Sequence, residues 1–481
     1  MSNIKQKTKI GIIWNLIEKI SVQVVGFVLN IILARLLTPH DYGTIGMLTV
    51  FLTFSNVFID SGFSRALIQR QDRTETDFST TLIFNVAVSC ILYGALFFLA
   101  PLIASFYKAP ELVGLQRVLF LVVIPNSLAV VQSARLQIAV DFQGIALINF
   151  ASTLLSGVVA IISAHKGWGP WALVVQAMAR ALSSSSLYWI FGRWMPRTGF
   201  SRESFGRLFG FGAKLLASGL LSTTITNVNN LLIGKYYAPA SLGFFTRAQQ
   251  FPELTAGAIA SVLNNTTFPL MASLQDDVQE LVSTLRRLIR LTALVVFPAM
   301  TGLACLSEPI IAVLLGEKWL PAADLLLWLS AAYIFTPLSI LNMNVLNAIG
   351  RSDLFLRIDL VKIPLILLTM MVTFPVSLKA VVIGRAVTAF IYFYINGFLI
   401  GRMYNFGASR QILASWKYIV SSVVMGTGVV LIDKCFDANL LTLFLVVFSG
   451  AVIYSLSLAL LREQEFCGIL RKVIGAVRCR G

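Results

Sequence analysis

The sequence predicts an all-α integral membrane protein with about fourteen transmembrane helices: two parallel-repeat lobes of six helices around a central cavity, and two further helices at the C-terminus. Three observations predict it, namely the composition, the length of the apolar runs and an internal repeat. Of 481 residues, 57% are hydrophobic and only 12% are charged, and the mean hydropathy is +0.81. These values lie outside the range of soluble globular proteins.

Apolar runs of about 20 residues, enough to cross about 30 Å of hydrocarbon as a helix, recur along the whole chain. The predicted spans are residues 9–36, 43–68, 79–106, 112–138, 143–164, 170–193, 208–235, 243–271, 284–306, 321–348, 354–374, 378–401, 413–432 and 439–461. A further run, PIIAVLLG at 309–316, is too short to cross and is expected to lie at the membrane interface or to re-enter.

The net charge of +16 reports topology rather than a nucleic-acid partner. If the N-terminus is cytoplasmic, the cytoplasmic segments hold 24 basic residues and the opposite loops hold 7. This asymmetry follows the positive-inside rule and places both termini in the cytoplasm. The other basic residues lie inside or at the edges of spans: Lys19, Arg117, Arg180, Lys214, Arg247, Lys362 and Arg385.

Several classes of site and segment are not expected. Glu18 and Lys19 interrupt the first apolar run and no small-residue cleavage site follows, so this run is interpreted as a retained span rather than a signal peptide. The five cysteines are scattered, which gives no pattern for zinc or a disulfide framework. There is no phosphate-binding loop, and His40 and His165 fall in outer loops, so no catalytic residue, metal or cofactor is predicted.

The repeat is visible in LNIILARLLTPHDYG at 29–43 and NNLLIGKYYAPASLG at 229–243. Four positions match at an offset of 200 residues: Asn30 with Asn230, Arg35 with Lys235, Pro39 with Pro239 and Gly43 with Gly243. Because an advance of six spans returns the chain to its starting side, the two copies have the same orientation in the membrane. The predicted division is an N-lobe at 1–200, a C-lobe at 201–404, and the last two spans with a cytoplasmic tail at 405–481.

Polar residues follow the same repeat on one face of each of four helices. They are Lys19, Gln23, Gly26 and Asn30 in the first span, Gly46, Thr49, Thr53, Asn56 and Asp60 in the second, Gly219, Thr223, Thr226 and Asn230 in the seventh, and Thr246, Gln250, Glu253, Gly257 and Ser261 in the eighth. Small polar stripes also serve as helix-packing faces in membrane bundles. The charges of Lys19, Asp60, Arg247 and Glu253 favour a hydrated cavity, because ionisable groups inside spans are costly and usually face water.

Four segments carry a resemblance to a known family: ARLLTPHDYGTIGMLTVF, FIDSGFSRALIQRQDRTETDFSTTLIFN, LAPLIASFYKAPEL and LGFFTRAQQFPELTAGAIASVLNNTTFPLMASLQDD. They resemble bacterial polysaccharide flippases of the O-antigen and colanic-acid exporter type. These flippases belong to the multidrug/oligosaccharidyl-lipid/polysaccharide exporter superfamily. The resemblance covers nearly the whole chain.

The resemblance implies an alternating-access carrier in the bacterial inner membrane that flips an undecaprenyl-pyrophosphate-linked oligosaccharide. Membrane lipid, a polysaccharide polymerase and a chain-length regulator are the further partners that it implies, and coupling would be to a proton or sodium gradient. FFTRAQQFPE is similar to a helix of the lipid II flippases in which an Arg faces the cavity, and that position is Arg247. Gln23 and Leu29 stand where those flippases carry Arg, which favours a glycan other than lipid II.

The candidate residues divide into two groups. Those expected to bind substrate are Arg247, Lys19, Gln23, Asn30, Asn56, Gln250, Asn230, Arg180 and Arg385. Asp60 and Glu253 are the candidates for coupling or gating.

Structural alternatives stay open for some of these residues. Arg117, Arg180 and Arg385 either line the cavity or act as structural cations, and Asp60 either serves coupling or pairs with Arg65. For Asp359 and Lys362, one turn apart, a local ion pair is expected.

Two other functions compete with a flippase. A drug or cation antiporter of the same superfamily usually has twelve helices and fewer basic cavity residues. A glycan polymerase or ligase normally needs a sizeable outer domain or loop, and every predicted outer loop here is short. A flippase, not an enzyme, is therefore the predicted function.

Overall fold

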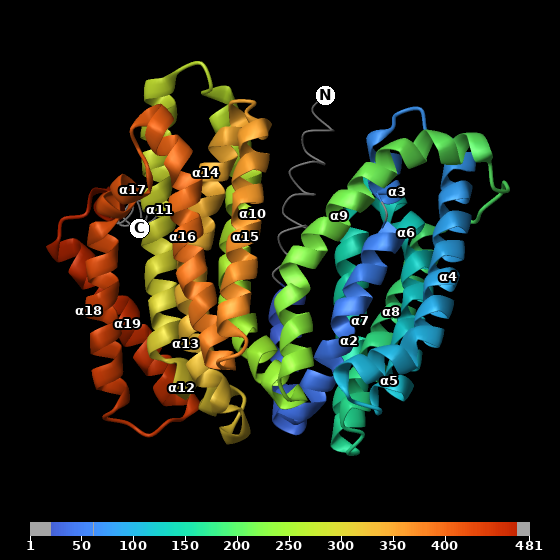
Figure 1. Cartoon of the computed structure of the whole chain (residues 1–481), viewed down its shortest axis with the longest axis horizontal. Helices are drawn as coiled ribbons and strands as arrows, with labels where there is room; N and C mark the ends of the chain where they lie inside the picture. The colour runs from blue at the N-terminus through green and yellow to red at the C-terminus, as the bar shows by residue number, and fades with distance from the viewer. Residues whose placement is uncertain (1–20, 61, 469–481) are drawn as a thin grey trace, which may run out of the picture. The chain divides into compact units, whose positions relative to one another are not determined.

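The computed structural model describes residues 21–60 and 62–468, and the secondary structure of these residues is helical throughout. The chain forms two compact units, Met1–Gly243 and Phe244–Gly481. The purely helical structure is expected, because a helix satisfies its own backbone hydrogen bonds in hydrocarbon without help from water. Figure 1 shows the helices along the chain.

The first unit begins, in its described part, with an apolar helix at Ser21–Leu36. Its further elements are α2 (Pro39–Asp60), α3 (Phe63–Gln69), α4 (Glu75–Tyr107), α5 (Leu112–Leu119), η1 (Phe120–Val122), α6 (Val123–Ile138), α7 (Phe142–His165), α8 (Pro170–Gly192) and α9 (Arg202–Tyr236). The two parts of α9, Arg202–Gly210 and Leu215–Tyr236, meet at an angle of 50°. This bend is visible in Figure 1.

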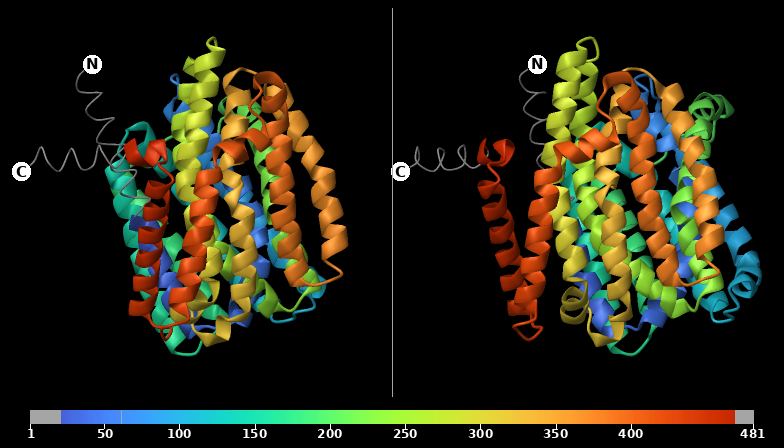
Figure 2. Two further views of the ribbon diagram at one scale, coloured as in Figure 1. Left: turned by 90° about the vertical axis from the view of Figure 1, so that its left-hand side faces the viewer. Right: turned by 60° about the vertical axis from the view of Figure 1, so that its left-hand side comes forward.

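The second unit contains nearly all of α10 (Pro239–Ser273), whose first turn belongs to the first unit. Its other elements are α11 (Val278–Cys305), α12 (Ser307–Leu314), η2 (Glu317–Trp319), α13 (Pro321–Ile334), α14 (Thr336–Ala348), α15 (Ser352–Thr373), α16 (Leu378–Tyr404), α17 (Ala408–Ala414), α18 (Trp416–Asp433) and α19 (Leu440–Leu460). Figure 2 shows α18 and α19 running side by side. Tyr454 on α19 donates a hydrogen bond to the carbonyl of Leu294 on α11 at 3.0 Å.

The all-helical membrane fold predicted from hydropathy is confirmed, and every predicted span overlaps one helix or a run of two or three consecutive helices in the described residues. Within residues 21–60 and 62–468, nine helical stretches are long and apolar enough to cross a membrane, or ten if the bent α9 is one span. The count of fourteen stays a prediction. The short run at 309–316 overlaps α12, whose residues Ile310 and Ile311 are buried.

The division into lobes also stays a prediction. In the structure, α9 packs against α2, α3 and α4 within the first unit. The compact unit therefore extends beyond residue 200, where the repeat places the end of the N-lobe. Phe205 and Leu208 of α9 pack with Phe63 of α3, which explains why α9 stays with this unit.

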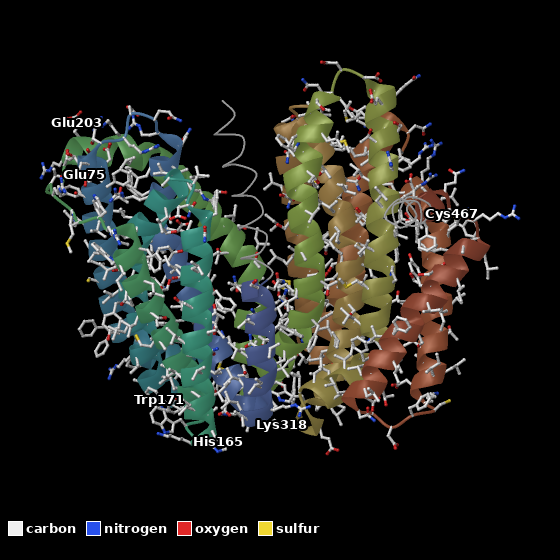
Figure 3. All side chains as sticks on the ribbon, turned by 180° about the vertical axis from the view of Figure 1, so that it is seen from behind. Glu75, His165, Trp171, Glu203, Lys318 and Cys467 are labelled. Carbon is white, nitrogen blue, oxygen red and sulfur yellow. The ribbon has the colours of Figure 1, made fainter. Side chains whose placement is uncertain are left out.

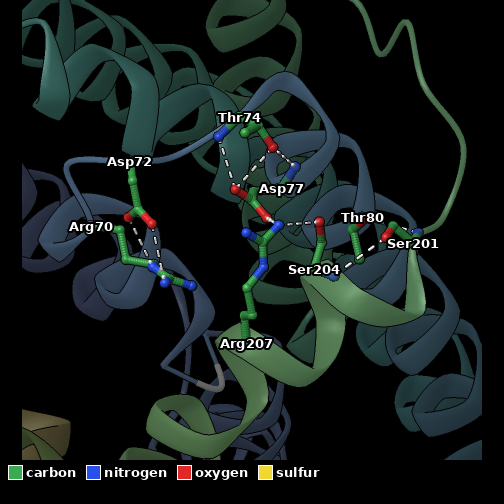
Figure 4. A network of polar contacts seen from close by, with 8 residues as sticks. All are labelled: Arg70, Asp72, Thr74, Asp77, Thr80, Ser201, Ser204 and Arg207. Atoms are coloured by element: carbon green, nitrogen blue, oxygen red, sulfur yellow. Dashed lines mark hydrogen bonds and ion pairs between the residues drawn. The ribbon is translucent and has the colours of Figure 1, made fainter.

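A polar network fixes the beginnings of α4 and α9 to each other (Figure 4). Thr74 caps α4, and the buried carboxylate of Asp77 accepts from the backbone N–H of Thr74 at 2.8 Å, which completes a capping box. Arg207 of α9 reaches the same carboxylate at 3.5 Å and donates to the hydroxyl of Ser204 at 3.3 Å. The Asp77 side chain is 2% exposed, so these contacts provide the polar partners that a buried charge requires.

Loops predicted to share one side of the membrane lie at the same end of the first unit. Glu75 and Glu203 lie at one end and His165 and Trp171 at the other (Figure 3). At the Glu75 end, the indole N–H of Trp194 donates to Glu75, and Gln132 donates to the Trp194 carbonyl at 2.8 Å. The segment between α8 and α9 is therefore held against α4 and α6.

The two repeated Pro and Gly turns begin two helices, since α2 starts at Pro39 and α10 starts at Pro239. The turns contact each other reciprocally within the first unit. A Cβ built on Gly43 would lie 1.6 Å from the carbonyl oxygen of Pro239, and one built on Gly243 would lie 2.0 Å from that of Pro39. Only glycine allows the two helix starts to approach this closely, which explains why both copies of the repeat carry it.

We expect Gly243→Ala to destabilise the protein by about 1 to 3 kcal/mol, because the added methyl group must push apart two backbones. Gly257→Ala, in the same helix, is the matched control, since a Cβ there has nothing within 4 Å. Alanine also favours helix over glycine by about 1 kcal/mol, so the control should be neutral or stabilising. The apparent melting temperature of the purified protein in detergent measures both effects, and equal values for the two variants would contradict the close contact.

Candidate functional site

A polar pocket lies within the first unit among α2, α3, α6 and α8. Its volume is about 360 Å³. The residues with polar side chains that line it are Asn56 and Asp60 from α2, Ser64 from α3, Asn126, Ser133 and Gln137 from α6, and Tyr188 from α8. The pocket thus gathers amides, hydroxyls and one carboxylate between helices whose other faces are apolar.

Hydrogen bonds join the pocket residues in pairs. The Asn126 amide donates to the Asn56 side-chain oxygen at 3.4 Å, and the Gln137 amide donates to the Ser133 hydroxyl at 3.2 Å. Amides and hydroxyls of this kind both donate and accept, so they can exchange these partners for the hydroxyl groups of a ligand.

Asp60 is the one acidic residue among the residues that line this pocket, and its side chain is exposed there. No ion pair between Asp60 and Arg65 occurs in the part of the chain that the structure describes. The structural alternative for Asp60, a pairing with Arg65, therefore has no support from the geometry.

A second polar cluster lies within the second unit and is built around Arg385 of α16. Its guanidinium donates to the Gln249 side-chain oxygen of α10 at 2.9 Å and to the Tyr333 hydroxyl of α13 at 3.0 Å. The amide of Gln249 in turn donates to the Glu253 carboxylate at 3.0 Å. Gln249 therefore bridges a cation and a carboxylate from different helices, and we call Arg385, Gln249, Glu253 and Tyr333 the Arg385 cluster.

Arg247 lies on α10, two residues before Gln249. Its guanidinium donates to the Gln250 side-chain oxygen at 2.7 Å, and both side chains are half-buried. Pro252 lies inside α10 and has no N–H, so the carbonyl of Ala248 loses its helical partner. This part of α10 thus contributes Arg247 and, through Gln249, holds Arg385 of α16, next to a weakened turn of helix.

The other predicted binding residues lie in different surroundings. Lys19 lies outside the described residues. Gln23 and Arg180 are exposed, and Asn230 is half-buried. Asn30 donates to the carbonyl of Gly26 in its own helix at 2.8 Å.

Two of the remaining span cations, Lys362 and Arg117, have structural contacts. Lys362 and Asp359 form the predicted ion pair, with 2.8 Å between nitrogen and oxygen. Arg117 lies over the ring of Phe97, 4.4 Å from its centroid. These contacts support a structural role for both cations.

The sequence interpretation missed Gln249 and Tyr333, which complete the Arg385 cluster, and the α6 residues of the pocket. The sequence does contain a signal for the α6 residues. Asn126, Ser133 and Gln137 are spaced by 7 and 4 residues and therefore share one helix face, like the polar residues of the first and second spans. Among the described residues, no group of three His, Cys, Asp or Glu side chains gathers that could hold a metal ion.

If the pocket of the first unit is hydrated, a cysteine at Ser133 should react readily with a water-soluble thiol reagent. Ser127→Cys is the matched control, because Ser127 lies on the same helix but is 0% exposed. We expect at least about tenfold faster labelling at 133 than at 127, measured in a variant without the native cysteines, because thiols react as solvated thiolates. Equal rates would show that water does not reach the pocket.

Comparison with known sequences gives three findings. A family model described as "Polysaccharide biosynthesis protein" matches residues 32–324, more than half of the chain. The chain is 28% identical over 479 residues to the teichuronic acid biosynthesis protein TuaB of Bacillus subtilis (strain 168), covering 98% of this chain and 99% of the relative. It is 26% identical over 325 residues to the lipopolysaccharide biosynthesis protein WzxC of Escherichia coli (strain K12), covering 66% of this chain and 65% of the relative.

The fold is similar to a solved structure of the lipid II flippase MurJ in an inward closed conformation. The TM-score is 0.75, and the match covers 96% of this chain and 99% of that chain at 14% sequence identity. An identity this low shows a shared fold alone. It confirms the predicted all-helical membrane fold, and the family match confirms the resemblance to polysaccharide biosynthesis proteins of this type: the chain is a multi-pass membrane protein that belongs to the polysaccharide biosynthesis protein family.

Proposed function

We propose that this protein is a flippase that moves undecaprenyl-pyrophosphate-linked oligosaccharide units across the bacterial inner membrane by alternating access, for the synthesis of O-antigen, capsule or exopolysaccharide. The observation that carries the proposal is the gathering of cations and amides within apolar helices, in Arg247 with Gln250 and in the Arg385 cluster. The relatives support it, since they are named for lipopolysaccharide and teichuronic acid biosynthesis, and the fold is that of a lipid II flippase.

The arginines suit the pyrophosphate of such a cargo, and the amide and hydroxyl side chains suit its glycan. A pyrophosphate carries at least two negative charges in a compact group, and an arginine holds it with two parallel charge-assisted hydrogen bonds. A glycan presents many hydroxyl groups. Amide and hydroxyl side chains can form hydrogen bonds with them, as in the polar pocket of the first unit, which is lined by Asn56 and Ser133. Both kinds of group are needed by a protein that moves a charged, hydroxyl-rich head through hydrocarbon.

The orientation in the membrane is part of the proposal. Both termini lie in the cytoplasm, as the ratio of 24 to 7 basic residues between the two sets of loops supports. The polymerase and the chain-length regulator of the same polysaccharide are the protein partners that this function would need.

The two competing functions have less support. An acidic site would suit an antiporter of cationic drugs, whereas the polar contacts of α10 and α16 involve two arginines, Arg247 and Arg385, and a single carboxylate, that of Glu253. A polymerase or ligase would be an enzyme, whereas the fold of this chain, whose family and relatives are named for polysaccharide biosynthesis, is similar to that of a flippase.

Arginine substitutions separate substrate binding from a structural role. We expect Arg247→Ala and Arg385→Ala to lower transport per molecule by at least about tenfold, because each loses a charge-assisted contact worth about 1.5 to 3 kcal/mol. Arg247→Lys should keep partial transport, since lysine keeps the charge but lacks the planar fork. Transport of lipid-linked oligosaccharide into reconstituted vesicles and the amount of folded protein are measured together.

The exposed loop residue Arg197 provides the control, and Arg197→Ala should transport normally. A normally inserted Arg247→Ala protein with full transport would remove Arg247 from the site. A loss of protein from the membrane with unchanged transport per molecule would assign these arginines a structural role.

Asp60 is our candidate for coupling transport to a proton or sodium gradient, together with Glu253. Because Asp60→Asn keeps the shape but cannot lose a proton or bind a cation by charge, it should lower transport and abolish the response to a gradient. Asp72→Asn is the control, since Asp72 is exposed and paired with Arg70 at 3.2 Å. Transport by Asp60→Asn that still rises with an imposed gradient would show that Asp60 is structural.

A further inference from the structure

An apolar groove lies within the second unit between the first turns of α15 and the last turns of α16. Its volume is about 560 Å³. Apart from Arg357, its lining is aliphatic or aromatic, from Leu354 and Ile358 on α15 to Ile391 and Leu399 on α16. None of its residues belongs to the Arg385 cluster or to the Arg247 pair.

Arg357 brings a charge into this apolar lining. The other charged side chains around it on α15 are paired: Arg351 with Asp353 at 3.0 Å, and Lys362 with Asp359 at 2.8 Å. Arg357 has no hydrogen-bond or ion-pair partner among the residues that the structure describes. The exposed Arg357 guanidinium, at the edge of an apolar groove, is thus available to an external anion.

The groove continues into a second, basic pocket of about 380 Å³. The two share Tyr394 and Phe398, and the second pocket adds Arg402 and Arg410. No carboxylate lines either of them. The apolar groove, which contains Arg357, thus adjoins two further arginines, Arg402 and Arg410.

Buried hydrogen bonds anchor the segment at the basic end of the groove. Gln411 of α17 and Asn342 of α14 exchange amide hydrogen bonds at 2.7 and 3.1 Å, and both side chains are buried. Gln411 also donates to the carbonyl of Phe406 at 3.0 Å. The segment that carries Arg410 is therefore held in place before any ligand binds, which lowers the entropic cost of binding.

We propose that this groove binds a glycerophospholipid with a net negative charge, with an acyl chain along the α15–α16 groove and the phosphate at Arg357 and Arg402. Charge complementarity selects an anionic headgroup, and the aliphatic lining selects a hydrocarbon chain. The outer faces of both helices are apolar, as Val361 (58% exposed) and Phe398 (65% exposed) show, so the groove opens where lipid is the neighbour. No amide lines the apolar groove itself, and the basic pocket adds only Asn405 and Ser409 besides its arginines, fewer groups that match glycan hydroxyls than the polar pocket of the first unit has.

The test is native mass spectrometry of the purified full chain in detergent, titrated with dioleoyl phosphatidylglycerol or with dioleoyl phosphatidylcholine. We expect preferential binding of phosphatidylglycerol, and at least about tenfold weaker binding by the double variant Arg357→Gln and Arg402→Gln, which loses two charge-assisted contacts. Ile395→Trp, which fills the groove without changing a charge, should weaken binding as well.

Arg351→Ala is the matched control, because Arg351 lies at the same end of α15 but is already paired with Asp353. Its affinity for phosphatidylglycerol should equal that of the unaltered protein. Melting temperatures in detergent verify that each variant is folded. Equal affinity of the unaltered protein for both lipids, unchanged binding by the double variant, or displacement of phosphatidylglycerol by equimolar polyprenyl phosphate would each overturn the proposal.

Discussion

A charged side chain inside an apolar helix bundle must find polar partners, and this constraint organises both units of the protein. An ionisable group at depth costs about 2.5 to 3.5 kcal/mol on insertion scales, unless hydrogen bonds or water offset the cost. Asp77 meets the constraint with a capping box and Arg207, and Lys362 meets it with Asp359. Arg385 meets it with Gln249 and Tyr333 from two other helices, and this last solution is the one that supports a function.

The local features of the fold could be predicted from the sequence. Hydropathy located the helices, because length and apolar composition are properties of consecutive residues. The repeat predicted that Pro39 and Pro239 stand at equivalent turns, and both begin a helix. The pair of Asp359 and Lys362 could be predicted for the same reason, since residues one turn apart on a helix are neighbours whatever the fold is.

Contacts between distant segments could not be predicted in this way. Gln249 and Arg385 are separated by 136 residues, so nothing local indicated that an amide would bridge Arg385 and Glu253. The contact of Gly43 with Pro239 is of the same kind: the repeat indicated that both glycines matter, but not that each lies against the proline of the other copy. The roles of the candidate residues in transport stay predictions, because geometry places side chains without showing what they bind.

If the protein carries a lipid-linked oligosaccharide to the outer leaflet, its loss should trap this cargo on the inner side of the membrane. Cells are depleted of the protein, and the lipid-linked oligosaccharide that accumulates is identified and located by its accessibility to a membrane-impermeant glycan-modifying enzyme. We expect a complete single repeat unit on its polyprenyl pyrophosphate carrier to accumulate in the inner leaflet, protected from the enzyme. Accumulation of the same unit in the outer leaflet would contradict it, because the block would then lie after translocation, at polymerisation or ligation.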